Sequence, residues 1–285
     1  MTTTPQHRQF ELFELPIAAL AWSGEGLPLI ALHGWLDNAA SFLPLAPWLT
    51  DHHLLAPDLI GHGHSAHLPP AAGYHLADYC RWVVALADTM GWERFGLIGH
   101  SMGAAVASIT AAAIPRRISA LVLIDGLGPL AFTPEQGIAR LQQCFDDTSS
   151  TRPKRHFPDL ASAVAVRQRL GRFPIGTAAA QLLTERGMRR EDDGYCWRHD
   201  ERLRGPNTHY YSPEQSAAVL RTIRAPTLFI QASTGALQGW SALESHLACI
   251  HALEQHTLPG GHHLHMEAPQ SVARLINSFL ARQSA

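Results

Sequence analysis

The chain alternates between short, continuously apolar runs and longer stretches in which apolar residues recur at helical spacing. The short runs lie at residues 28–33, 53–57, 94–98, 118–125, 226–231 and 249–258. The stretches at helical spacing lie at residues 74–90, 104–113, 241–247 and 267–281. A strand that is apolar on both faces is typical of a parallel sheet covered by helices on each side. The pattern therefore predicts an α/β fold with a mostly parallel central sheet flanked by helices.

The N-terminal part of the chain predicts a few further elements. Two short strands are expected at residues 10–15 and 17–22, with the turn at Pro16. A helix is expected to end near Leu49, with Asp37 or Asn38 as its N-cap. Both of these side chains accept hydrogen bonds from the free N–H groups of a first helical turn.

The alternation stops at residue 126 and resumes at residue 225. Between these points the chain reads as several helices joined by turns that contain proline and glycine. We interpret this segment as a mainly helical cap inserted over the carboxyl edge of the sheet. The predicted domains are a first part of the α/β core at 1–125, the cap at 126–224 and a second part of the core at 225–285.

A Gly-x-Ser-x-Gly motif, Gly99-His100-Ser101-Met102-Gly103, stands between an apolar run and an Ala-rich helical stretch. Strand–turn–helix is the setting in which this motif forms a nucleophile elbow. A serine on so sharp a turn has strained backbone angles, and larger side chains on either side of it would collide. We therefore expect Ser101 to be a nucleophile at a helix N-terminus, where an oxyanion is stabilised.

An attacking serine needs a base for its proton and N–H donors for the oxyanion. The candidate base is His262, which follows two glycines in the loop before the last helix. Its neighbours His263 and His265 are expected to pack locally or face solvent. The expected oxyanion donors are the backbone N–H groups of Trp35, after an apolar run, and of Met102, next to the nucleophile.

A histidine base also needs a carboxylate on its other ring nitrogen. In this architecture the acid commonly follows the strand after the cap, but that loop, residues 231–240, contains no Asp or Glu. Asp125 ends the strand that follows the elbow helix, at the same edge of the sheet, and is the preferred candidate. Glu244 and Asp200 stay open as alternatives.

Amino-acid composition limits which binding partners, cofactors and metals are expected for this protein. Of the 285 residues, 46% are hydrophobic and 16% charged, with a formal charge of −2, so neither disorder nor a nucleic-acid or anionic membrane partner is expected. The four cysteines lie far apart, and no apolar run reaches the length of a membrane span. We expect a cytoplasmic protein without cofactor or metal. Asp58, in a loop with several histidines, is expected to bind backbone amides, because no cysteine or further carboxylate completes a metal site.

Several motifs together resemble the α/β-hydrolase superfamily. They are His33-Gly34-Trp35-Leu36-Asp37-Asn38-Ala39, Asp58-x-x-Gly61-His62-Gly63-x-Ser65, the elbow and Gly261-His262. Over nearly its whole length the chain resembles the serine-hydrolase-like group of capped hydrolases. The resemblance implies Ser101 as nucleophile, His262 as base, and Trp35 with Met102 as oxyanion donors.

The same resemblance bears on the acid and on related activities. Some haloalkane dehalogenases have their acid after the strand that follows the nucleophile, which is the place of Asp125. Those enzymes and the epoxide hydrolases use an aspartate nucleophile, so Ser101 argues against both activities.

We predict a serine hydrolase, specifically a carboxylesterase that cleaves small or medium acyl esters through an acyl-enzyme, with a small acyl molecule as its binding partner. One alternative keeps the triad and cleaves a thioester, a lactone or a carbon–carbon bond. Another is a ligand-binding protein without hydrolytic activity, which the missing acid after the cap favours. Acyl length and oligomeric state do not follow from the sequence.

Overall fold

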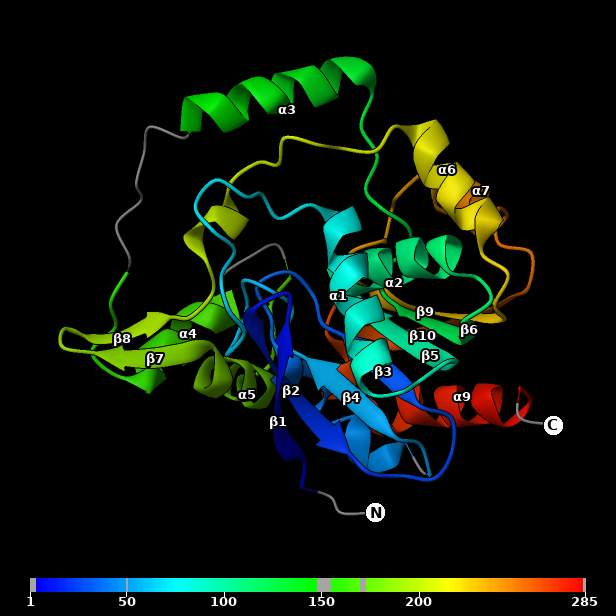
Figure 1. Cartoon of the computed structure of the whole chain (residues 1–285), viewed down its shortest axis with the longest axis horizontal. Coiled ribbons are helices and arrows are strands. Elements are labelled where there is room, and N and C mark those ends of the chain that lie inside the picture. The colour runs from blue at the N-terminus through cyan, green and yellow to red at the C-terminus, as the bar shows by residue number, and fades with distance from the viewer. Residues whose placement is uncertain (1–3, 50, 148–154, 170–172, 284–285) are drawn as a thin grey trace.

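The computed structural model describes residues 4–49, 51–147, 155–169 and 173–283. Within these residues an eight-stranded sheet has the order β1-β2-β4-β3-β5-β6-β9-β10, as Figure 1 shows. Its strands are β1 (Gln6–Leu12), β2 (Leu15–Trp22), β3 (Leu29–Leu32), β4 (Leu54–Pro57), β5 (Phe95–His100), β6 (Ile118–Ile124), β9 (Thr227–Thr234) and β10 (Leu253–Gly261). The β1–β2 and β2–β4 pairs are antiparallel and the other pairs are parallel. The predicted mostly parallel sheet is confirmed.

Helices cover both faces of this sheet. One apolar cluster joins it to α1 (Leu76–Thr89), α2 (Met102–Ala113), α6 (Pro213–Thr222) and α7 (Leu243–Leu247). A second cluster joins it to η1 (Ala39–Phe42), η2 (Ala46–Trp48), α8 (Leu264–Glu267) and α9 (Pro269–Ala281). In β3, Ile30 lies in the first cluster and Ala31 in the second, because successive side chains point to opposite faces. Burial on both faces explains why the strands are continuously apolar.

Two local predictions near the N-terminus are wrong. The hairpin turns at Phe13 and Glu14, whose φ angles of 50° and 62° are those of a tight turn that matches the twist of paired strands. Pro16 instead lies within β2. The expected helix towards Leu49 is replaced by the short 3₁₀ helices η1 and η2, because the prolines at 44 and 47 lack the N–H that a continuous helix needs. Asn38 does cap η1 as predicted, since its side chain accepts from the N–H of residue 40 (3.0 Å).

The segment between β6 and β9 packs against the loops at the carboxyl ends of β3 and β4. It contains α3 (Pro134–Asp147), α4 (Leu160–Arg169), α5 (Thr177–Gly187), the strands β7 (Met188–Glu191) and β8 (Gly194–Trp197), η3 (Glu201–Arg204) and α6. Arg167 binds Asp37 after β3, and Arg186 binds Asp58 after β4. Figure 1 shows α4, α5 and the β7–β8 hairpin on the left of the molecule, with α3 at the top of the view. The sequence pattern did not predict the hairpin, and the domain boundaries stay predictions.

Every helix in the described part of the chain is too short or too polar to cross a membrane.

Candidate active site

Ser101 lies on the sharp turn between β5 and α2. Its φ of 53° and ψ of −116° fall in a region that residues other than glycine rarely adopt. A Cβ on Gly103 would lie 2.0 Å from the carbonyl oxygen of Leu32, and a Cβ on Gly99 would lie 2.5 Å from the Cα of Ala104. Both positions therefore require glycine, which is the physical reason for the motif.

Three side chains predicted from separate parts of the chain lie together at this turn. The Nε2 atom of His262 is 2.9 Å from the Oγ of Ser101, and its Nδ1 atom is 2.5 Å from Oδ2 of Asp125. Because a carboxylate only accepts hydrogen bonds, these partners assign the ring proton to Nδ1. The lone pair on Nε2 then accepts from the serine hydroxyl. His262 and Asp125 are 7% and 1% exposed, so this hydrogen-bonded chain is largely shielded from water.

Asp125 is held by the loop that follows β9. The backbone N–H groups of Ala232 and Ala236 donate to its two carboxylate oxygens over 3.2 Å and 2.7 Å. A Cβ on Gly235 would lie 2.2 Å from Oδ2 of Asp125, so the loop approaches this closely only because residue 235 is glycine. The loop that lacks an acid of its own thus surrounds the carboxylate supplied by the neighbouring strand.

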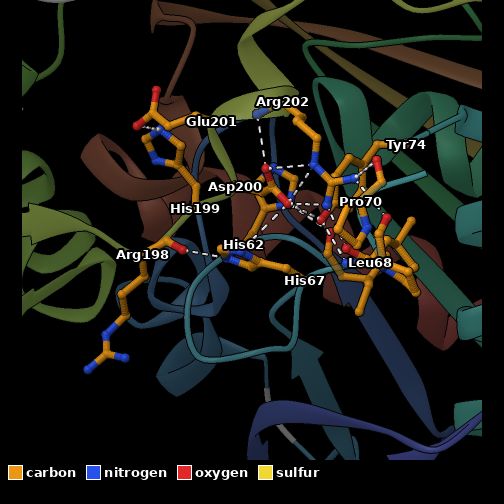
Figure 2. A network of polar contacts seen from close by, with 12 residues as sticks. His62, His67, Leu68, Pro70, Tyr74, Arg198, His199, Asp200, Glu201 and Arg202 are labelled. Atoms are coloured by element: carbon orange, nitrogen blue, oxygen red, sulfur yellow. Dashed lines mark hydrogen bonds and ion pairs between the residues drawn. The ribbon is translucent and has the colours of Figure 1, made fainter. Parts of the chain in front are cut away.

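The two alternative acids occupy other places. Asp200 accepts from the Tyr74 hydroxyl (2.7 Å) and from the Arg202 guanidinium, as Figure 2 shows. Arg202 also donates to carbonyl oxygens of residues 68–70 and 72. Asp200 therefore joins the segment between β6 and β9 to the loop before α1. Burial and the hydrogen bond to Asp200 raise the pKa of the Tyr74 hydroxyl. Glu244 is an exposed residue of α7. The carboxylate that contacts His262 is that of Asp125, not that of Asp200 or Glu244.

The two expected oxyanion donors border the same turn. Met102 is the first residue of α2, so its backbone N–H has no partner within the helix. Trp35 follows β3, and its indole Nε1 donates to the carbonyl oxygen of Leu203 in η3 over 2.9 Å. Both residues line the cavity that contains Ser101. Their role as oxyanion donors stays a prediction.

A buried polar layer supports the loop that carries His262. The Nε2–H of His100 donates to the carbonyl oxygen of His262 over 2.9 Å. Asp37 accepts from Nε2 of His263 (3.2 Å) and from Arg167 (2.6 Å). Burial opposes the charge on Asp37, but His263 and Arg167 hold the pKa of this carboxyl well below its usual value. Burial also lowers the pKa of His100 well below its usual value, with the neighbouring histidines adding to the effect.

Sequence reasoning missed this layer, because its members come from the loop after β3, from β5, from α4 and from the loop after β10. The available signals were the motif that ends in Asp37-Asn38 and the cluster of histidines at 262–265. His263 was expected either to pack locally or to face solvent. The structure buries it against Asp37, so local packing is the outcome.

Two groups of possible metal ligands occur among the described residues. One comprises Asp37, His100 and His263, and the other His156, Glu191 and Cys196. In each group an arginine already binds the carboxylate, Arg167 on Asp37 and Arg189 on Glu191. Because a guanidinium at this distance repels a cation, neither group is assigned to a metal.

Asp58 binds backbone amides as predicted. It accepts from the N–H groups of Ala39 (2.7 Å) and His64 (2.8 Å). In addition, Arg186 of α5 donates to both carboxylate oxygens over 2.9 Å and 2.8 Å. This arginine was not predicted, and it joins α5, in the segment between β6 and β9, to the loop after β4.

A cavity of about 640 Å³ opens over Ser101 and His262. Its wall is mostly apolar and includes Met102, Leu127, Phe132, Tyr211 and Trp240. Residues of the 126–224 segment line much of it, so this segment shapes the space above the candidate nucleophile. A cavity of this size accommodates a small ligand beside Ser101.

Comparison with known proteins places this geometry in a family. Residues 28–269 match the α/β hydrolase fold family. A serine hydrolase-like protein of Dictyostelium discoideum is 31% identical over 283 residues, covering 93% of this chain and 79% of that protein. The solved structure of a hypothetical protein from Pseudomonas aeruginosa PAO1 has a TM-score of 0.92 and 38% identity, covering 97% of this chain and 99% of that one. The thioesterase domain from the curacin biosynthetic pathway has a TM-score of 0.83 and 25% identity, covering 96% and 99%. The chain belongs to the α/β hydrolase fold family and to its serine hydrolase-like group.

Proposed function

We propose that this protein is a carboxylesterase that hydrolyses small or medium acyl esters, with Ser101 as its nucleophile. The observation that carries the proposal is the hydrogen-bonded chain from Ser101 Oγ through His262 to Asp125, with distances of 2.9 Å and 2.5 Å. In this chain an acceptor nitrogen faces the serine hydroxyl, and a carboxylate orients the ring. The family membership supports hydrolysis, and the ester as substrate is our inference.

The mechanism follows from the positions of these groups. As Ser101 Oγ attacks the ester carbonyl, its proton passes to Nε2 of His262. The carbonyl oxygen becomes an oxyanion, which the backbone N–H groups of Trp35 and Met102 stabilise. Asp125 stabilises the imidazolium. The proton then passes from Nε2 to the departing alcohol oxygen, leaving an acyl-enzyme. Water attacks this ester with His262 again accepting a proton, and the acid and the free serine are released.

The cavity supports an acyl ester as the substrate. Its apolar wall at Met102, Leu127 and Trp240 favours a hydrocarbon chain, because burying each methylene group contributes about 0.8 kcal/mol. The volume of about 640 Å³ lies within the range of sites for small molecules.

The proposal is tested with a fluorescent fluorophosphonate and a series of p-nitrophenyl acyl esters. We expect the wild type to be labelled and to hydrolyse the esters, and Ser101→Ala to do neither. Ser108→Ala is the matched control: this serine lies on the same helix, and its hydroxyl bonds the backbone of residue 104 (2.8 Å). Labelling of Ser101→Ala, or an unlabelled and inactive wild type, would contradict the proposal.

A thioester is the second candidate substrate. The similarity to the curacin thioesterase domain, at 25% identity, favours it, and the same triad chemistry applies because only the leaving group changes from an alcohol to a thiol. Matched acyl esters of ethanol and N-acetylcysteamine distinguish the two. A kcat/KM ratio that favours the thioester far beyond its greater chemical reactivity would replace the ester as the proposed substrate.

A further inference from the structure

Arg140 is a charged side chain in the wall of the cavity that contains Ser101 and His262. It extends from α3, which crosses above the body of the molecule in Figure 1. Most of the remaining wall is apolar. Arg140 itself is half-buried. A cation at such a place changes what the cavity binds, because it attracts an anionic group and repels a second cation.

Two aromatic rings hold the guanidinium in place. Its central carbon lies 4.0 Å from the ring centroid of Phe132 and 5.4 Å from that of Tyr210. These two rings contact one another edge to face, 5.0 Å apart. Stacking on rings uses the face of a guanidinium and leaves its N–H edge free to donate. Arg140 is therefore positioned without using its hydrogen-bond donors on the rings.

The charge of Arg140 is not neutralised by any carboxylate among the residues that the structure describes. Three other arginines of the same segment show the contrast. Arg167 binds Asp37, Arg186 binds Asp58 and Arg202 binds Asp200. The carboxylate in the cavity wall, Asp125, already contacts His262. As far as the described residues show, the cavity thus presents a positive charge without a carboxylate partner at one place in its wall.

We propose that the substrate carries a carboxylate that binds Arg140 while its ester carbonyl lies at Ser101. The proposed substrate class is the half-ester of an aliphatic dicarboxylic acid, whose hydrocarbon chain fills the apolar part of the cavity between the two groups. A guanidinium matches a carboxylate with two parallel hydrogen bonds. That the substrate is an ester rests on the proposed function. That the substrate carries a negative charge rests on Arg140 alone.

The test compares esters that differ only in their terminal group. One series is the monobutyl esters of the acids from succinic to suberic acid. The other is the butyl esters of the monocarboxylic acids in which a methyl group replaces the free carboxylate. At the best chain length we expect kcat/KM to favour the charged ester by roughly 10- to 100-fold, the usual range for a hydrogen-bonded charge pair.

Variants of Arg140 assign this preference to its charge. Arg140→Gln is expected to lower kcat/KM for the charged ester by about 10- to 100-fold relative to the neutral ester, so that the preference is lost. Arg140→Lys is expected to retain part of the preference. Arg155→Gln is the matched control, because Arg155 is exposed and also lies over a ring, 4.9 Å from the centroid of Phe157, outside the cavity wall. Neutral esters hydrolysed without a preference for the carboxylate, or a preference that survives Arg140→Gln, would overturn the inference and leave the proposed function intact.

Binding provides a measurement that does not depend on hydrolysis. In Ser101→Ala, calorimetry is expected to show tighter binding of monobutyl adipate than of butyl hexanoate, and addition of Arg140→Gln is expected to remove the difference. Equal affinities in Ser101→Ala would refute the carboxylate site even if no ester were hydrolysed by the wild type. If the affinity difference is present but the wild type hydrolyses neither ester, the carboxylate site stands and the esterase proposal fails.

Discussion

Replacement of Asp125 by asparagine is the sharpest test of the candidate triad. The carboxylate receives three hydrogen bonds, one from the His262 ring and one each from the backbone N–H groups of Ala232 and Ala236. An asparagine of the same shape keeps a single acceptor oxygen and presents an NH₂ group on the other side. If the oxygen takes the place of Oδ1, which accepts from Ala232, the NH₂ group takes the place of Oδ2 and faces both Nδ1 of His262 and the N–H of Ala236. This orientation favours the His262 tautomer whose proton lies on Nε2. That proton then opposes transfer from Ser101.

The expected loss follows from this tautomer change. In the serine-protease template the same substitution lowers kcat by ~10⁴, and we expect a loss of that order for Asp125→Asn with little change in KM. Stability should also fall, by about 1–3 kcal/mol, because a buried N–H of the loop loses its acceptor. These two effects are separable because activity is measured per folded molecule.

The assay uses acyl ester hydrolysis and the rate of fluorophosphonate labelling, with circular dichroism to establish that each variant is folded. Asp200→Asn and Glu244→Gln are the comparison variants. Asp200→Asn weakens the contacts with Tyr74 and Arg202, so it is expected to reduce stability while keeping kcat within about tenfold. Glu244→Gln, at an exposed position, should resemble the wild type. Near-normal turnover in folded Asp125→Asn, together with inactivity of either comparison variant, would refute Asp125 as the acid.

Three further predictions concern the free energy of unfolding. The fully buried histidines whose pKa burial lowers well below the usual 6.5 are His62, His100 and His265. Because the unfolded chain protonates them at a higher pH than the folded chain does, the stability they contribute is complete above about pH 6.5 and is lost as the pH falls below it. Urea unfolding is expected to show a loss of about 4 kcal/mol between pH 7.5 and 5.5, at most about 1.4 kcal/mol for each ring, and a constant value would contradict their burial in the neutral form. Arg186→Met leaves the buried carboxylate of Asp58 without its charged partner and is expected to lower the free energy of unfolding by about 3–5 kcal/mol. A decrease below about 1 kcal/mol in the same assay would argue against Arg186 as the partner that stabilises the Asp58 carboxylate. Gly103→Ala places a Cβ 2.0 Å from the carbonyl oxygen of Leu32 and is expected to abolish activity and soluble expression. Gly137→Ala, with no atom within 4 Å of the added Cβ, should instead stabilise α3 by about 0.5–1 kcal/mol. Similar melting temperatures for both variants would contradict the packing argument.

The sequence by itself determined the elements that carry the candidate site. The strand β5, the elbow and α2 are contiguous, so the apolar run, the two glycines and the Ala-rich stretch sufficed to predict their local geometry. Parallel strands bring their carboxyl ends to one edge of a sheet, which led to Asp125 and His262 as partners for Ser101. The structure brings these three side chains into contact, and their catalytic roles stay predictions until the variants are measured.

Only the tertiary structure decided which carboxylate contacts His262. Asp125, Asp200 and Glu244 were all compatible with the chain order, and the choice depended on how the loop after β9 folds around one of them. The pairs Arg186–Asp58 and Arg167–Asp37 likewise join residues 128 and 130 positions apart. Helical and strand periodicity describe how a segment faces its surroundings, but they contain no information on which distant side chain it will meet. Those contacts arise from the packing of the loops and of the segment between β6 and β9 against the sheet, which local patterns do not encode.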